Sequence, residues 1–131
     1  MKRFAVIGMG RFGYYMTRAL FEEGNEVVAI DRSQERAQAV KAFSTSAIVQ
    51  DATDSEALKN IGLDEMDGVV VTTGARISTS ILICYHLKSL GIEQIIVKAE
   101  DEDHGKILTQ LGATQIIRPG RDIAIRIARR L

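Results

Sequence analysis

Residues 4–13 read Phe-Ala-Val-Ile-Gly-Met-Gly-Arg-Phe-Gly, an apolar run that passes directly into a G-x-G-x-x-G loop. An apolar run of this length indicates a buried strand, and the residues behind the loop have the spacing of a helix. In that context Gly8 permits a tight turn, Gly10 lets the backbone approach a pyrophosphate, and Gly13 lets the helix pack closely on the strand. The stretch therefore predicts the first β-α turn of a dinucleotide-binding fold.

The same loop attracts an anion in two ways. The free amides at the start of the helix and the helix dipole both favour negative charge. Arg11 adds a cation beside the phosphates, which is more positive charge than a pyrophosphate requires and therefore favours a more anionic nucleotide. The alternative is that Arg11 is an exposed arginine at a helix start without a ligand contact. We expect ligand contacts from the whole loop: Gly8, Met9, Gly10, Arg11, Phe12 and Gly13.

The alternation of a short β-branched run with a longer helical stretch repeats about six times along the chain, which is typical of right-handed βαβ units. The expected strands are 4–7, 27–30, 47–49, 68–72, 95–98 and 115–117. The expected helices are 10–23, 34–43, 55–61, 77–90 and 103–111, with Ser33 as the cap of the second. These elements predict an α/β fold, a Rossmann-type doubly wound parallel six-stranded sheet with helices on both faces.

Length and composition agree with a single domain over residues 1–131, which is too short for a complete two-domain dehydrogenase. Apolar residues make up 46% and charged residues 26% of the chain, a globular balance. The formal net charge is zero, which argues against a nucleic-acid partner and against a polybasic membrane surface.

The single cysteine, Cys84, cannot form a disulfide within the chain, and the N-terminal residues contain no signal-peptide apolar stretch. The longest apolar runs are far short of the roughly 20 residues of a membrane span. We therefore expect a cytoplasmic protein without membrane insertion, in which any membrane association is through a partner.

Asp31 ends the second predicted strand, 18 positions after Gly13. A carboxylate at this place accepts hydrogen bonds from the hydroxyls of an adenosine ribose and repels a 2′-phosphate, so NADP is disfavoured. Arg32 lies along the adenine or in solvent, although a guanidinium can also receive such a phosphate.

Further ligand contacts are expected where later strands end. The Asp51 carboxylate or the Ala52 amide can form hydrogen bonds with the amino group and ring nitrogen of an adenine. The alternative for Asp51 and Thr53 is helix capping, with Thr53 and Glu56 in a capping box. Small residues after strand four suit a ribose or phosphate that passes close to the backbone. Thr73 and Gly74 are such residues, and Lys98, at the end of the fifth predicted strand, can steer a phosphate or pair with the acidic residues 101–103; these three residues complete the expected cofactor site.

No catalytic residue is expected. A dehydrogenase requires a proton donor and a substrate-orienting group beside the nicotinamide, usually from a second domain. His86 and His104 are interpreted as structural or exposed, because no carboxylate is placed to orient either. One cysteine and two scattered histidines also lack the spacing of a metal site.

Residues 121–131 predict a C-terminal amphipathic helix, with Ile123, Ile127 and Leu131 at helical spacing. Its apolar stripe has two interpretations of equal weight. It packs on its own sheet, or it is exposed as an oligomer interface or a connection to another domain.

The glycine turn with Arg11, Asp31 after strand two, and Asp51-Ala52-Thr53 after strand three together resemble the RCK/KTN (TrkA N-terminal) domains that regulate potassium channels and transporters. The resemblance covers residues 3 to about 130. It implies binding of NAD(H) or ATP/ADP, with Arg11 at the phosphates, and a homodimer, often within an octameric ring, that acts on an integral membrane potassium transporter or channel.

Two departures from the family bear on this expectation. Gly120 follows Pro119 where the family commonly has glutamate, and the second regulatory domain of many members is not in this sequence. We expect a regulatory module rather than an enzyme. The alternatives are the nucleotide-binding half of an NAD-dependent oxidoreductase, or a ring component whose nucleotide never exchanges.

Overall fold

The computed structural model describes residues 1–73 and 76–131. Its strands form one sheet in the order β3-β2-β1-β4-β5-β6, and each neighbouring pair is parallel. The strands are β1 (Arg3–Ile7), β2 (Glu26–Asp31), β3 (Ser46–Val49), β4 (Gly68–Val71), β5 (Ile95–Lys98) and β6 (Gln115–Ile117). The predicted six-stranded sheet is confirmed, with strand ends within one residue of those expected.

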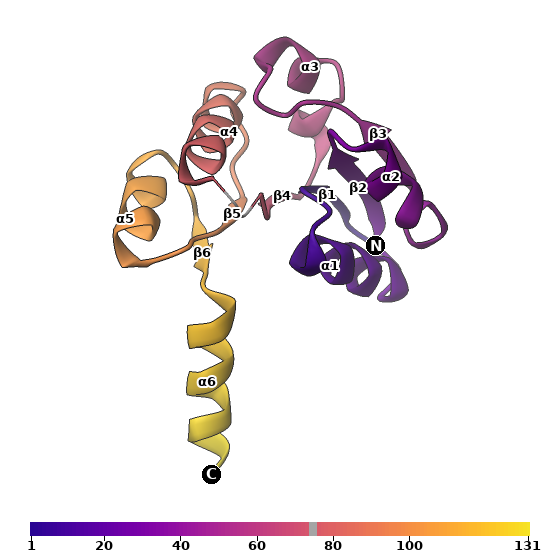
Figure 1. Ribbon diagram of the computed structural model, residues 1–131. Helices are drawn as coiled ribbons and strands as arrows, with labels where there is room; N and C mark the ends of the chain where they lie inside the picture. The colour runs from indigo at the N-terminus through magenta and orange to yellow at the C-terminus, as the bar shows by residue number, and fades with distance from the viewer. Residues whose placement is uncertain (74–75) are drawn as a thin grey trace.

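The helices follow the predicted order (Figure 1). They are α1 (Arg11–Glu22), α2 (Gln34–Ala39), α3 (Ser55–Lys59), α4 (Ile77–Ser89), α5 (Glu102–Gln110) and α6 (Pro119–Arg130), with 3-10 turns η1 (Lys41–Phe43) and η2 (Leu63–Glu65). The single helix expected over 34–43 is wrong, because the chain leaves the helix at Val40 and continues as η1. Ser33 caps α2 as expected, with its hydroxyl accepting from the Arg36 amide at 3.3 Å.

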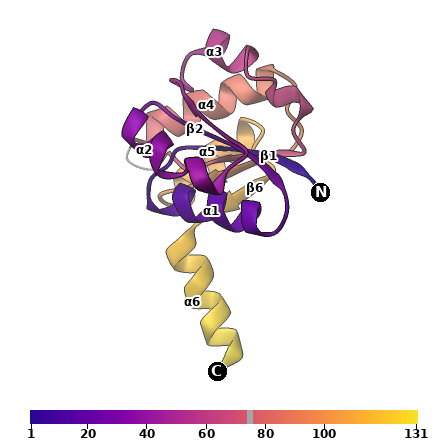
Figure 2. The same cartoon turned by 90° about the vertical axis from the view of Figure 1, so that its right-hand side faces the viewer.

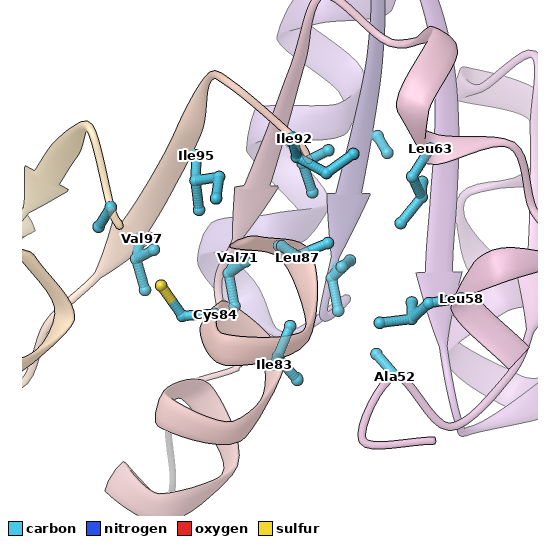
Figure 3. Packing of buried hydrophobic residues seen from close by; sticks show 14 of the residues in the cluster. Ala52, Leu58, Leu63, Val71, Ile83, Cys84, Leu87, Ile92, Ile95 and Val97 are labelled. Carbon is cyan, nitrogen blue, oxygen red and sulfur yellow. The ribbon is translucent and has the colours of Figure 1, made fainter. Parts of the chain in front are cut away.

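The two faces of the sheet carry separate apolar cores, as a doubly wound sheet requires. On one face the core consists of Val6, Val27, Ala29 and Val70 under α1 and Val40. On the other face α3, α4 and α5 cover the remaining inward side chains, and Figure 3 shows Ile83, Cys84 and Leu87 gathered between α4 and the strands. Both faces of the central strands are therefore dry, which explains their continuous apolar sequences.

The C-terminal helix contributes nothing to either core. None of its residues is buried, and Figure 2 shows it extending away from the body of the domain. The interpretation in which this helix packs on its own sheet is wrong. The sheet already has helices on both faces, so α6 leaves the domain at β6 with its apolar side chains uncovered.

We expect Leu87→Ala to lower the free energy of unfolding by about 2–5 kcal/mol, because a fully buried side chain leaves a cavity. Leu82, on the same helix but 41% exposed, provides the matched control, and Leu82→Ala is expected to cost less than about 1 kcal/mol. Urea denaturation of the two variants measures both values. Equal losses would contradict the placement of α4 described above.

Candidate nucleotide-binding site

The glycine loop lies at the carboxyl edge of the sheet, where the strand order reverses. Strands β2 and β3 follow β1 on one side, and β4, β5 and β6 follow on the other. Loops on the two sides of such a point run apart and leave a crevice, which is the usual ligand site of an open α/β sheet.

A cleft of about 300 Å³ occupies this position. It is bordered by the loops that follow β1, β2, β3 and β4 and by the first turns of α2 and α4. Its lining comprises Ile7, Gly8, Gly10, Ile30, Asp31, Arg32, Arg36, Gln50, Asp51, Ala52, Thr53, Thr72, Thr73, Arg76, Thr79 and Ile83. The structure thus brings together residues from four segments that the sequence had singled out.

The three glycines of the loop differ in what surrounds them. Gly8 has a φ of +99°, and a Cβ at Gly13 would overlap the Gly8 carbonyl oxygen, so both positions require glycine. A Cβ at Gly10 would meet nothing within 4 Å. Gly10 lines the cleft, so its missing side chain leaves room for a ligand beside the start of α1.

The peptide between Gly8 and Met9 is held from both neighbouring strands. Thr72, after β4, donates its hydroxyl to the Gly8 carbonyl oxygen at 2.6 Å. The Met9 amide donates to Oδ2 of Asp31, the last residue of β2, at 2.7 Å. Sequence analysis missed this role of Thr72, because it considered the residues after strand four only as contacts for a ribose or phosphate of the ligand.

Asp31 is 8% exposed, and its side chain serves the protein as well as the cleft. In addition to the Met9 amide, it accepts the Ser33 amide on Oδ1 at 2.8 Å. A carboxylate has about four acceptor positions, so two remain for ribose hydroxyls. Arg32 and Arg36 both line the cleft. Sequence analysis expected Arg32 there but did not include Arg36.

Asp51 and Thr53 form hydrogen bonds with each other and do not cap a helix. Asp51 Oδ1 accepts from the Thr53 hydroxyl at 2.6 Å and from its amide at 2.9 Å. These two bonds lower the pKa of the exposed Asp51 carboxyl, with a smaller contribution from the charge of Arg32. The capping interpretation is wrong: Asp54 caps α3 and accepts the amides of Glu56 and Ala57.

Other expected residues lie outside this lining. The Met9 side chain is buried in the core against Thr17, and Arg11 is exposed at the first residue of α1. Phe12 and Lys98 are half-buried away from the cleft wall. Gly74 lies outside the described residues. Thr73 lines the cleft, and its buried hydroxyl has no hydrogen-bond partner within the described ranges 1–73 and 76–131.

Both histidines make defined contacts between elements. His86 Nε2 donates to the Thr53 carbonyl oxygen at 3.0 Å, and His104 is buried beside Ser80. Within the part of the chain that the structure describes, no group of three or more His, Cys, Asp or Glu residues could hold a metal ion. No helix among those residues is long and apolar enough to cross a membrane.

The sequence matches the family model of the TrkA-N domain over residues 4–119. The chain belongs to the TrkA-N domain family. This TrkA-N chain is 45% identical to Ktr system potassium uptake protein C of Bacillus subtilis (strain 168) over 97% of its length, and 38% identical to Ktr system potassium uptake protein A of Vibrio alginolyticus over 99%. It spans 58% and 59% of those two relatives.

Solved structures confirm the fold of the TrkA-N chain. The TrkA-N domain of inner membrane protein ybaL from Escherichia coli has a TM-score of 0.85 and 21% identity, covering 99% of this chain and 96% of that one. The GsuK channel bound to NAD has a TM-score of 0.76 and 16% identity, covering 88% and 21%. A GsuK structure bound to ADP has the same score and identity, covering 88% and 31%.

The pKa of the Asp51 carboxyl is expected to rise in Thr53→Val, which removes the hydroxyl bond that contributes most to its lowered value. The pKa of Asp51 is lower in the folded chain than in the unfolded chain, so the ionised carboxylate stabilises the folded state at pH values above the unfolded-state pKa. This stabilisation of wild-type Asp51 is lost as the pH falls through its lowered pKa in the acidic range. Carboxyl NMR titration measures the pKa directly. An unchanged value in Thr53→Val, or a larger change in Arg32→Gln, would contradict this assignment.

Proposed function

We propose that this TrkA-N chain is the nucleotide-binding regulatory domain of a potassium uptake or potassium channel system. The observation that carries the proposal is its 45% identity, along almost its whole length, to a Ktr potassium uptake protein. The cleft at the switch point supplies the ligand site. Its proposed role is to bind a nucleotide and to signal the nucleotide occupancy of the cleft to an integral membrane partner from the cytoplasmic side.

The proposed ligand is NAD(H) or ATP/ADP. The cleft offers an acidic side chain for a ribose, open space at Gly10 for phosphates, and exposed arginines at its rim. GsuK, which shares this fold, binds NAD and ADP, and this supports an adenine nucleotide here. The Asp31 carboxylate disfavours NADP, because a 2′-phosphate would meet a like charge.

Regulation requires that the ligands differ in their affinity for two arrangements of the assembly, because equal affinity shifts no equilibrium. Arg11 is proposed to distinguish nucleotides by their phosphates: its side chain is exposed at the loop rather than engaged in the cleft wall. The proposed role is not catalytic. An oxidoreductase half would instead show turnover when its missing domain is restored.

The first test of this function is calorimetric titration of the nucleotide-stripped chain with ATP, ADP, NAD and NADH. We expect binding of at least one of them, and about tenfold weaker binding by Thr72→Val, which frees the Gly8 carbonyl oxygen while retaining the shape of the side chain. Thr114→Val removes a comparable hydroxyl bond, to Ile95, far along the sheet and provides the control. Failure of all four ligands to bind would reject the proposal.

We further propose that the exposed stripe of α6 pairs two copies of the chain into a homodimer, which can repeat within an octameric ring. Ile123 and Ile127, on one side of the helix, are 51% and 53% exposed, and the fully exposed Leu131, which follows the last helical residue, continues the same interval of four. An uncovered stripe of this kind is typical of a helix that binds another apolar surface.

The double change Ile123→Asp and Ile127→Asp is expected to convert dimers to monomers, because it places two charges in the proposed apolar contact. Light scattering over a concentration series measures the mass. The change Arg129→Asp, on the side of the helix opposite Ile123 and Ile127, serves as the control and should leave the mass unchanged. Dimers that survive the double change would place the interface elsewhere.

A further inference from the structure

Buried His104 joins α4 to the start of α5 through both of its ring nitrogens. The residue is 2% exposed. Its Nε2 lies 2.7 Å from the hydroxyl of Ser80, in the first turn of α4, and its Nδ1 lies 3.0 Å from the amide of Glu100, after β5. The ring therefore connects the element that borders the cleft to the element beyond it.

The partners of the ring determine where its proton lies. An amide can only donate, so Nδ1 accepts from Glu100. Ser80 donates its one hydroxyl hydrogen to the Ile77 carbonyl oxygen at 3.0 Å, which leaves its oxygen as an acceptor. His104 is consequently neutral with the hydrogen on Nε2, and this single arrangement satisfies every polar atom of the contact.

The Ser80 end of this contact lies against the cleft. Arg76 precedes α4 and lines the cleft, as do Thr79, next to Ser80, and Ile83, one turn later. A ligand that contacts this turn of α4 therefore acts on a segment whose other side is held by His104. Both residues of the pair are buried, so a movement of this turn that broke the bond would leave polar groups unpaired at a cost in free energy.

The His104 end controls the start of α5. The His104 amide donates to Asp101, the cap of α5, at 2.8 Å, and the Glu100 amide donates to the ring. A displaced ring would break the bond from Glu100 directly, next to the residue that caps α5. Helix α5 leads directly into β6 and then α6, the helix with the uncovered stripe.

We propose that the Ser80–His104 hydrogen bond couples nucleotide occupancy of the cleft to the position and stability of α5, and thereby to β6 and α6. The inference rests on the proposed function, because it requires a nucleotide in the cleft. Ser80 and His104 are positioning residues, which act through the first turn of α4 and the cap of α5. Two sites are coupled when both shift the equilibrium between discrete arrangements of one structural element.

Two substitutions of His104 separate its two bonds. The side-chain amide nitrogen of His104→Gln reaches the place of Nε2 and keeps a donor for Ser80. The side-chain oxygen of His104→Asn reaches the place of Nδ1 and keeps an acceptor for Glu100, but loses Ser80. Ser80→Ala removes the same bond from the other side. Ser89→Ala is the matched control, because the Ser89 hydroxyl bonds only within α4, to the Tyr85 carbonyl oxygen.

The readout is hydrogen exchange of the α5 amides with and without saturating ATP, and in a parallel series NAD, in samples whose occupancy is measured by calorimetry. In the wild-type chain, Ser89→Ala and His104→Gln, we expect nucleotide to slow exchange in α5 by about threefold or more. In Ser80→Ala and His104→Asn we expect nucleotide to bind but to leave α5 exchange unchanged.

Three outcomes would overturn the inference. Nucleotide can bind the wild-type chain without any effect on α5, or it can slow α5 equally in Ser80→Ala and His104→Asn; either result rejects the coupling and leaves the proposed function standing. Absence of nucleotide binding by the wild-type chain rejects the proposed function and the coupling with it. Calorimetry on the same samples distinguishes the last case from the first two.

Discussion

The peptide between Gly8 and Met9 fixes the geometry on which the cleft depends. Its carbonyl oxygen accepts the Thr72 hydroxyl and its amide donates to Asp31, so the strands on both sides of β1 hold one peptide plane. The close approach of Gly13 to the Gly8 carbonyl then sets where α1 begins. The order of the strands thus determines the conformation of the loop, and the loop determines where the helix begins. The space beside Gly10 remains open as a result.

Helix α4 connects the cleft to the rest of the domain. Its apolar side packs on the sheet through Ile83 and Leu87, which ties the helix to the core. Two of its polar side chains also contact other segments: His86 donates to the Thr53 carbonyl oxygen at the cleft rim, and Ser80, on the buried side of the helix, accepts from His104. His104, which sequence analysis interpreted as structural or exposed, is buried and joins the helix that borders the cleft to α5.

The sheet could be predicted because buried parallel strands require continuous apolar runs, and these are visible in the sequence. The placement of Asp31 followed from its distance to the glycine loop. The cap of α3 was missed because Asp51, Thr53 and Asp54 are all acceptors in front of one helix, and local spacing does not choose among them. The contact of Thr72 with Gly8 joins residues 64 positions apart, and only the pairing of β1 with β4 brings them together.

The position of β1 in the sheet also sets the order in which the domain can be completed. Strand β1 pairs on one side with β2, which follows it in the chain, and on the other side with the later strand β4, so its second edge stays open until residue 71 has been made. The glycine loop acquires its second anchor only with the next residue, Thr72. During translation the segment up to residue 71 therefore exists with a loop that is held from one side, and the cleft becomes competent to hold a ligand only after Thr72 has been synthesised.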